Sequence, residues 1–263
     1  VFIGADYSFG SNDYELRWSF LEKSSEIAKK LGILDEDKFK SEILKKISPA
    51  LNANRVIGSL GNIFASRISR EFELGGPSAL ICSGESSGFA ALEAAIESLE
   101  SYDIDYALVG SVYLGSEVRN LLARQDHYES HEFSAEGSTM ILLRRVDFKE
   151  ERKGSLAKLE RNFNGFERLS FGPEIRQGLR MVDLRSFFGY GHLNDDLLGL
   201  VMALECIKNK VLPSAQTLNP KPYLDMRKSL DLAAQPWLKN QGDLRAITLS
   251  SYDPNQNFSF RLT

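Results

Sequence analysis

A strand, a tight turn and a helix follow one another between residues 75 and 99, and this succession constrains the fold more than any other part of the sequence. Gly75, Gly76 and Pro77 are strong turn formers. The short apolar run 79–82 predicts a buried strand, and the alanine-rich segment 86–99 predicts a helix. The sequence therefore predicts a sharp elbow at residues 83–85, between a strand and a helix.

Further strands and helices alternate along the chain. Apolar runs predict strands at 1–5, 104–109, 140–145 and 156–162, and helical spacing predicts helices at 16–31, 35–51, 58–70 and 194–209. This alternation favours an α/β sheet with mostly parallel strands. A β-hairpin is expected from 246–249 and 258–262 around a turn at 253–255, whereas 163–184 has no readable pattern.

Composition limits the class of protein. Hydrophobic residues make up 43% and charged residues 26%, which is typical of a folded globular chain, and the net charge of −4 argues against nucleic-acid binding. Two cysteines, Cys82 and Cys206, are too few for a disulfide framework, so a reduced, cytoplasmic protein is expected. Cys82 is expected to be a small buried hydrophobe. No apolar run reaches the length of a membrane span.

Four segments, in order, resemble the β-ketoacyl synthase family. They are ASRIS at 65–69 leading to GPSALICSGESSGFAAL at 76–92, DYALVGSV at 105–112, AEGSTMILLRR at 135–145, and Gly191-His192-Leu193 followed by Gly199-Leu200 and Val211-Leu212-Pro213. The resemblance implies a thiolase-like layered α-β-α-β-α fold, as one domain over 1–263 with halves of roughly 1–150 and 151–263. The first half is expected to be truncated at its front, because 1–5 looks like the middle of a strand and the chain is then an excerpt.

The resemblance also assigns the candidate site, and it implies neither a cofactor nor a metal. Glu85 stands at the position of the family's nucleophilic cysteine, and His192 at its second catalytic histidine. A carboxylate cannot hold an acyl chain as a thioester, so condensation is not expected. The segment with the family's first catalytic histidine has no counterpart, and Phe187 replaces a lysine. In the C-terminal turn only Asn257 matches; Phe187 and Asn257 are the predicted substrate-binding residues.

Glu85 allows two interpretations. At a helix N-terminus a carboxylate is stabilised by the free N–H groups and the helix dipole, which favours a structural role. The alternative is a functional carboxylate, either a general base paired with His192 or a fixed anion that imitates a carboxylated acyl group. The serines at 83, 86 and 87 are expected to cap the helix, and His127 and His131 to lie at the surface without a metal.

The resemblance favours a non-condensing domain or subunit, similar to a chain-length factor. Such a chain pairs with an active ketosynthase and shapes acyl-chain binding in fatty-acid, polyunsaturated-fatty-acid or polyketide biosynthesis. The implied partners are that ketosynthase and acyl carrier protein, in a homo- or heterodimer formed across the strand 79–82. The alternatives are a decarboxylase of malonyl-carrier protein and a stand-alone acyl-handling enzyme that uses Glu85 and His192.

Overall fold

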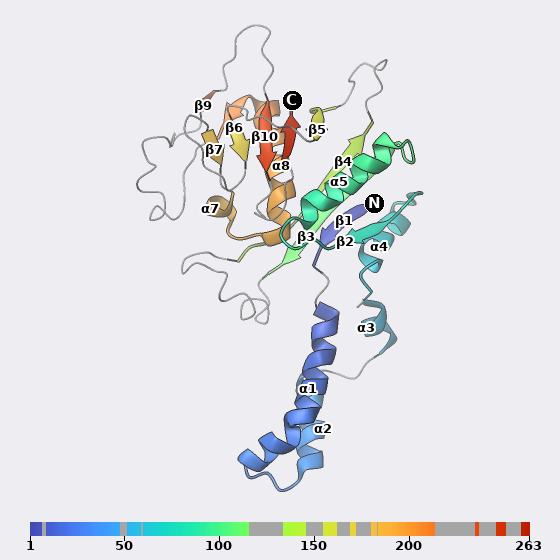
Figure 1. The fold of residues 1–263 in the computed structure, drawn as a ribbon, viewed down its shortest axis with the longest axis vertical. Helices are drawn as coiled ribbons and strands as arrows, with labels where there is room; N and C mark the ends of the chain where they lie inside the picture. Colours follow the sequence, from blue (N-terminus) through green and yellow to red (C-terminus); the bar gives the residue numbers. More distant parts are fainter. Residues whose placement is uncertain are drawn as a thin grey trace.

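The structure is a computed structural model. It describes residues 1–6, 9–47, 52–58, 60–115, 134–145, 155–161, 169–171, 180–182, 184–213, 235–236, 246–250 and 259–263. In this part of the chain, strands form a four-stranded sheet, a five-stranded sheet and a two-stranded ribbon. The two larger sheets are separated by helices that share one core (Figure 1).

The four-stranded sheet has the order β2-β1-β3-β4, with strands β2 (Ala79–Ile81), β1 (Phe2–Ala5), β3 (Tyr106–Leu114) and β4 (Glu136–Arg144). β1 runs parallel to both of its neighbours, whereas β4 is antiparallel to β3. Helix α5 (Ser87–Glu100) lies close against β1, because a Cβ atom at Gly4 would lie only 2.5 Å from the carbonyl oxygen of Ser87. The expected strand, elbow and helix are therefore present, and glycine at position 4 permits their close packing.

The five-stranded sheet is built from the later part of the chain. Its order is β5 (Leu159–Arg161), β11 (Ser259–Leu262), β10 (Ile247–Ser250), β6 (Leu169–Phe171) and β7 (Arg180–Val182). β10 and β11 form the predicted antiparallel hairpin, while β6 is parallel to β10 and β7. The expectation of mostly parallel strands is confirmed for the described strands. Each sheet is mixed, because β4 in the first sheet and β11 in the second run opposite to the other strands.

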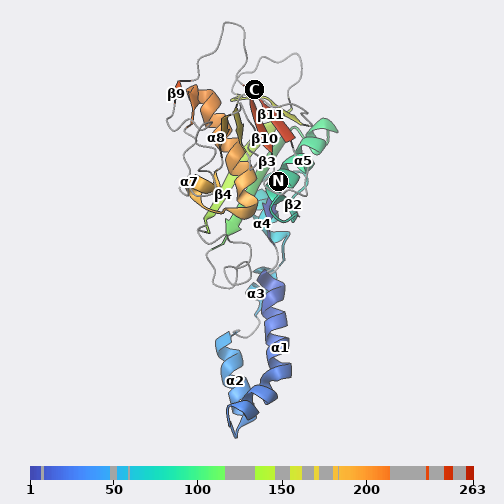
Figure 2. The ribbon, with the colours of Figure 1, turned by 60° about the vertical axis from the view of Figure 1, so that its left-hand side comes forward.

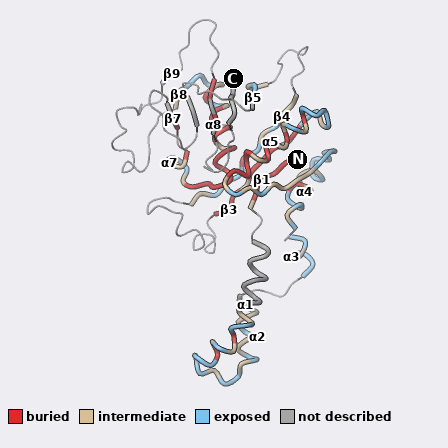
Figure 3. Tube along the Cα trace, in the orientation of Figure 1, coloured by how far each residue is buried: buried red, intermediate tan, exposed pale blue. Residues whose placement is uncertain are grey.

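Helices α5 and α8 (Asp195–Asn209) form the layer between the two sheets, as Figure 2 shows for α8. Phe89 and Leu92 of α5 meet Leu197 and Leu200 of α8 in one buried cluster. Figure 3 shows the same burial as red stretches along both helices. On the other face of the first sheet, helix α4 (Ile63–Glu71) contributes the fully buried Ala65 to a second, smaller cluster.

Between β1 and β2 the chain forms helices α1 (Phe9–Lys30), α2 (Glu36–Ile47) and α3 (Ala53–Gly58). α1 and α2 pair as a hairpin, with the rings of Phe20 and Phe39 6.3 Å apart, and project away from the sheets (Figures 1 and 2). The remaining described elements are helix α7 (Arg185–Phe188), the 3-10 turn η1 (His192–Asn194), and strands β8 (Val211–Leu212) and β9 (Gln235–Pro236). Among the described residues, none of the helices has the length and apolarity that crossing a membrane requires.

Candidate functional site

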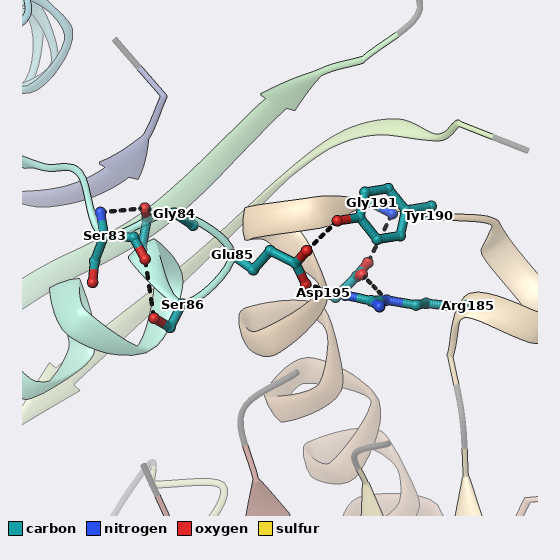
Figure 4. A network of polar contacts seen from close by, with 9 residues as sticks. Ser83, Gly84, Glu85, Ser86, Arg185, Tyr190, Gly191 and Asp195 are labelled. Carbon is teal, nitrogen blue, oxygen red and sulfur yellow. Dashed lines mark hydrogen bonds and ion pairs between the residues drawn. The ribbon is translucent and has the colours of Figure 1, made fainter. Parts of the chain in front are cut away.

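The elbow lies between β2 and α5, and serine hydroxyls shape it (Figure 4). The Ser86 hydroxyl donates to the carbonyl oxygen of Ser83 at 3.0 Å. The Ser87 hydroxyl donates to the carbonyl oxygen of Gly84 at 2.7 Å and accepts the N–H of Ser83 at 2.8 Å. Ser86 stands at the N-cap position of α5, as expected, but its side chain makes no cap hydrogen bond, and the hydroxyls of Ser86 and Ser87 bond to the elbow backbone instead. Gly84, with φ of +58°, supplies the left-handed conformation that the turn requires.

Glu85 projects from the elbow toward residues 100 or more positions later in the chain. The Tyr190 hydroxyl donates to Oε1 of Glu85, and Arg185 Nη2 donates to Oε2 at 2.8 Å (Figure 4). The side chain of Glu85 is 30% exposed. Both oxygens of the carboxylate are thus engaged by donors from the α7–η1 region.

Arg185 is itself held in place by a second carboxylate. Its Nε donates to Asp195 Oδ2 at 2.8 Å, and the Asp195 side chain is only 2% exposed. The N–H of Gly191 donates to Asp195 Oδ1 at 3.0 Å, and a Cβ at position 191 would lie 2.4 Å from that oxygen. The Arg185 guanidinium carbon also lies 4.4 Å from the centre of the Tyr190 ring. Glu85, Arg185, Tyr190 and Asp195 are called the carboxylate network below.

The electrostatics of this network keep Glu85 ionised. Burial alone would raise the pKa of Glu85, but the hydrogen bonds from Tyr190 and Arg185 and the positive charges of Arg185 and His192 outweigh it, so this pKa lies below the usual glutamate value. Burial lowers the pKa of Arg185, yet Asp195 and Glu85 raise it above its ordinary value. A carboxylate with a lowered pKa is a weak base, so the geometry disfavours general-base chemistry at Glu85.

His192 lies beside the network. It is 6% exposed and adopts a left-handed φ of +50°. Its ring stacks on Tyr113, with ring centres 5.2 Å apart, and meets the edge of the Tyr190 ring at 5.6 Å. The structure therefore brings the predicted pair Glu85 and His192 into one site, in which the Tyr190 side chain contacts both.

Comparison with known proteins shows which family and which solved structures this chain resembles. Residues 19–145 match the family model for the Beta-ketoacyl synthase, N-terminal domain. The ketosynthase from module 6 of the bacillaene synthase of Bacillus subtilis 168 superposes with a TM-score of 0.59 at 17% identity, over 81% of this chain and 51% of that one. The oxazolomycin ketosynthase domain OzmH KS7 of Streptomyces albus JA3453 gives 0.60 at 16% identity, over 99% and 54%. No curated protein shows significant similarity.

The chain has the thiolase-like fold of the ketosynthases. The predicted fold class is thereby confirmed, and the family-model match over residues 19–145 together with the solved structures supports the predicted similarity to ketosynthases. This ketosynthase-like chain spans about half the length of the bacillaene ketosynthase that it matches, 51%. The division into halves near residue 150 and the role of each site residue stay predictions.

Other predicted residues of the ketosynthase-like chain have different outcomes. Phe187 lies on α7, but its side chain is outside the described residues, as are Asn257, His127 and His131 altogether. Among the described residues, no group of three or more His, Cys, Asp and Glu side chains is arranged to hold a metal ion.

The two cysteines differ in environment. Cys82 is exposed, and its thiol donates to the carbonyl oxygen of Ala5 at 3.0 Å, so the expectation of burial was wrong. β2 ends at Ile81, and Cys82 therefore lies beyond the last paired residue, where strand alternation no longer determines burial. Cys206 is buried, and this burial, helped by the charge of Glu205, raises the pKa of its thiol to about 11.

Sequence reasoning missed the partners of Glu85. Arg185 directly follows the stretch 163–184, which has no readable pattern, and nothing local marks it as a ligand of the elbow. Asp195 gave a weak signal, since an acidic residue at the start of a helix has an ordinary explanation in the helix dipole. Its burial beside Gly191 is what requires a cation, and that burial is visible only in the fold.

Proposed function

We propose that this ketosynthase-like chain is a non-condensing partner in acyl-chain biosynthesis. In this role it pairs with an active ketosynthase and shapes the binding of a carrier-protein-bound acyl chain in fatty-acid, polyunsaturated-fatty-acid or polyketide biosynthesis. The similarity to ketosynthases of the bacillaene and oxazolomycin synthases favours the polyketide setting. The observation that carries the proposal is the ionised Glu85, bonded to Arg185 and Tyr190, at the elbow position where the resemblance places a cysteine.

The site lacks the chemistry of an acyl carrier. Glu85 offers a carboxylate whose oxygens are both hydrogen-bonded, and the nearest thiol, Cys82, donates to a backbone carbonyl. Neither group is suited to form the thioester on which condensation depends.

The other candidate activities fit the network less well. Decarboxylation of a malonyl group needs free donors for the developing enolate oxygen, and Glu85 already engages Arg185 and Tyr190. A stand-alone enzyme that uses Glu85 as a base would need a raised pKa, whereas the pKa of Glu85 is lowered. A chain that binds without catalysis needs neither free donors for an enolate oxygen nor a raised pKa of Glu85.

Pairing is supported by the edge of the first sheet. β2 is the terminal strand in the order β2-β1-β3-β4, so among the described residues no strand pairs with its outer edge. An open edge is a template for a strand from another chain. The segment 60–74 that leads into β2 exposes large apolar side chains, which are Leu60, Phe64, Phe72 and Leu74. Edge and apolar side chains together suit a homo- or heterodimer.

Co-purification tests the proposal. The tagged chain is co-expressed with a candidate active ketosynthase and an acyl carrier protein, and complexes are analysed by affinity capture and light scattering. We expect a stable complex that contains the ketosynthase. Phe72→Glu should weaken it, because Phe72 is 67% exposed in the segment 60–74 that precedes β2. Leu34→Glu should not, because Leu34 is fully exposed (101%) in the segment that joins α1 to α2. A chain that stays monomeric with every candidate contradicts the proposal.

A further inference from the structure

The two donors that bind Glu85 are positioned by groups other than Glu85. Arg185 is fixed by its bond to Asp195 Oδ2 and by its place over the Tyr190 ring. Tyr190 is buried, its carbonyl accepts the N–H of Ala135 at 2.9 Å, and its ring meets His192 edge-on. Removal of the Glu85 side chain would therefore leave both donors in place.

Glu85 reaches these donors from a different part of the fold. It stands at the elbow after β2, whereas Arg185 and Tyr190 belong to the α7–η1 region (Figure 4). A guanidinium and a phenol that converge on the two oxygens of one carboxylate form a receptor for that group, since charge-assisted bonds from arginine suit planar oxyanions. The positive charge of His192, when it is protonated, favours an anion at the same point.

We propose that Arg185 and Tyr190 form a carboxylate-binding site and that Glu85 is its tethered occupant. The ligand class is a small carboxylate, such as acetate or the free carboxylate of a carboxylated acyl group. In the native chain Glu85 keeps such groups away from the elbow. The inference goes beyond the pairing proposed above and applies equally to a chain that pairs with nothing.

The Glu85→Ala variant exposes the site to a probe of known structure. The substitution removes a methylene and a carboxylate, and acetate has a methyl group and a carboxylate of matching size. The thermal midpoint is measured for the isolated chain against sodium acetate, with sodium chloride holding the ionic strength constant. We expect the midpoint of Glu85→Ala to rise with acetate and to saturate, because a ligand that binds only the folded state stabilises it.

Matched controls locate the effect. Acetamide has the shape of acetate without its charge and should give no saturable rise. The native chain, Glu85→Gln, which keeps the site filled, and Glu42→Ala, which alters an exposed glutamate on α2, should not respond to acetate. In the double variant Glu85→Ala/Tyr190→Phe, which keeps the Arg185–Asp195 pair, the affinity for acetate should fall about 10-fold, because a hydrogen bond to the charged carboxylate is lost.

Two results would contradict the proposed carboxylate-binding site. If Glu85→Ala shows no saturable response to acetate beyond that to acetamide, or if the double variant responds just as strongly, Arg185 and Tyr190 do not form the site. Should Glu85→Ala fail to fold in chloride, its refolding yield is measured in acetate and in acetamide. A higher yield in acetate alone supports the inference, and equal yields contradict it. Because no partner is present, this outcome is independent of the co-purification experiment.

Discussion

Arg185 Nη2 lies 2.8 Å from Glu85 Oε2, and this ion pair connects the elbow that follows β2 to a helix 100 residues later. The same guanidinium binds Asp195, the first residue of α8. One side chain thus joins the N-terminal ends of the two helices that lie between the sheets. The elbow carries a permanent charge network at the position where the ketosynthase resemblance places a thiol.

Arg185→Met should destabilise the fold strongly. Asp195, which is 2% exposed, would lose its cation and remain as a buried charge, and breaking such a pair costs about 3–5 kcal/mol. Urea unfolding followed by circular dichroism measures this loss. Arg70→Met alters an exposed arginine on α4 and should change the free energy of unfolding by less than about 0.5 kcal/mol. Similar losses for the two variants would show that buried Asp195 does not depend on Arg185 for its stability.

The stabilising effect of the Glu85 charge should depend on pH. The pKa of Glu85 is lowered in the folded state, so the contribution is present above the unfolded value of about 4.3 and is lost as pH falls through the folded pKa. The native chain should therefore be more stable than Glu85→Gln near neutral pH, and the difference should shrink below about pH 4.3. Urea unfolding of both proteins across this range checks the sign. A difference that grows on acidification would show that the folded pKa is raised.

Gly4→Ala should weaken the packing of α5 on the first sheet. The new Cβ would lie 2.5 Å from the carbonyl oxygen of Ser87, so the strand or the helix must shift, at a cost of about 1–3 kcal/mol. Gly58→Ala is the control, because a Cβ there has no neighbour within 4 Å. Thermal unfolding compares the two variants. An equal midpoint for both would mean that β1 and α5 are less closely packed than described.

The two cysteines should react at different rates. Cys82 is exposed, whereas burial raises the pKa of Cys206 to about 11, so little of the Cys206 thiolate exists at neutral pH. A thiol reagent should modify one cysteine in the folded chain and both in denaturant. The rapid reaction should disappear in Cys82→Ser. If Cys206 were modified before Cys82 in the folded chain, the assignment of α8 to the core would be contradicted.

Local patterns account for the features that the sequence could predict, and long-range contacts account for those that it could not. The elbow and the β10–β11 hairpin were predicted because turn residues and apolar periodicity are local signals. The mostly parallel strand direction was also predicted, but the antiparallel pairing of β4 with β3 was not, since it depends on how the chain returns to the sheet. For the candidate site, Glu85 and His192 were named from the resemblance, and their roles stay predictions. Arg185 could not be found, because its role depends on the buried Asp195 and on an elbow 100 residues away.

The proposed function requires that the elbow carries no acyl group, and intact-protein mass spectrometry can detect such a group. The chain is incubated with an acyl-carrier-protein thioester, together with an active ketosynthase as the positive control. We expect an acyl adduct on the control and an unchanged mass for this chain. A stoichiometric adduct on this chain, lost in Glu85→Ala or in Cys82→Ser, would contradict it.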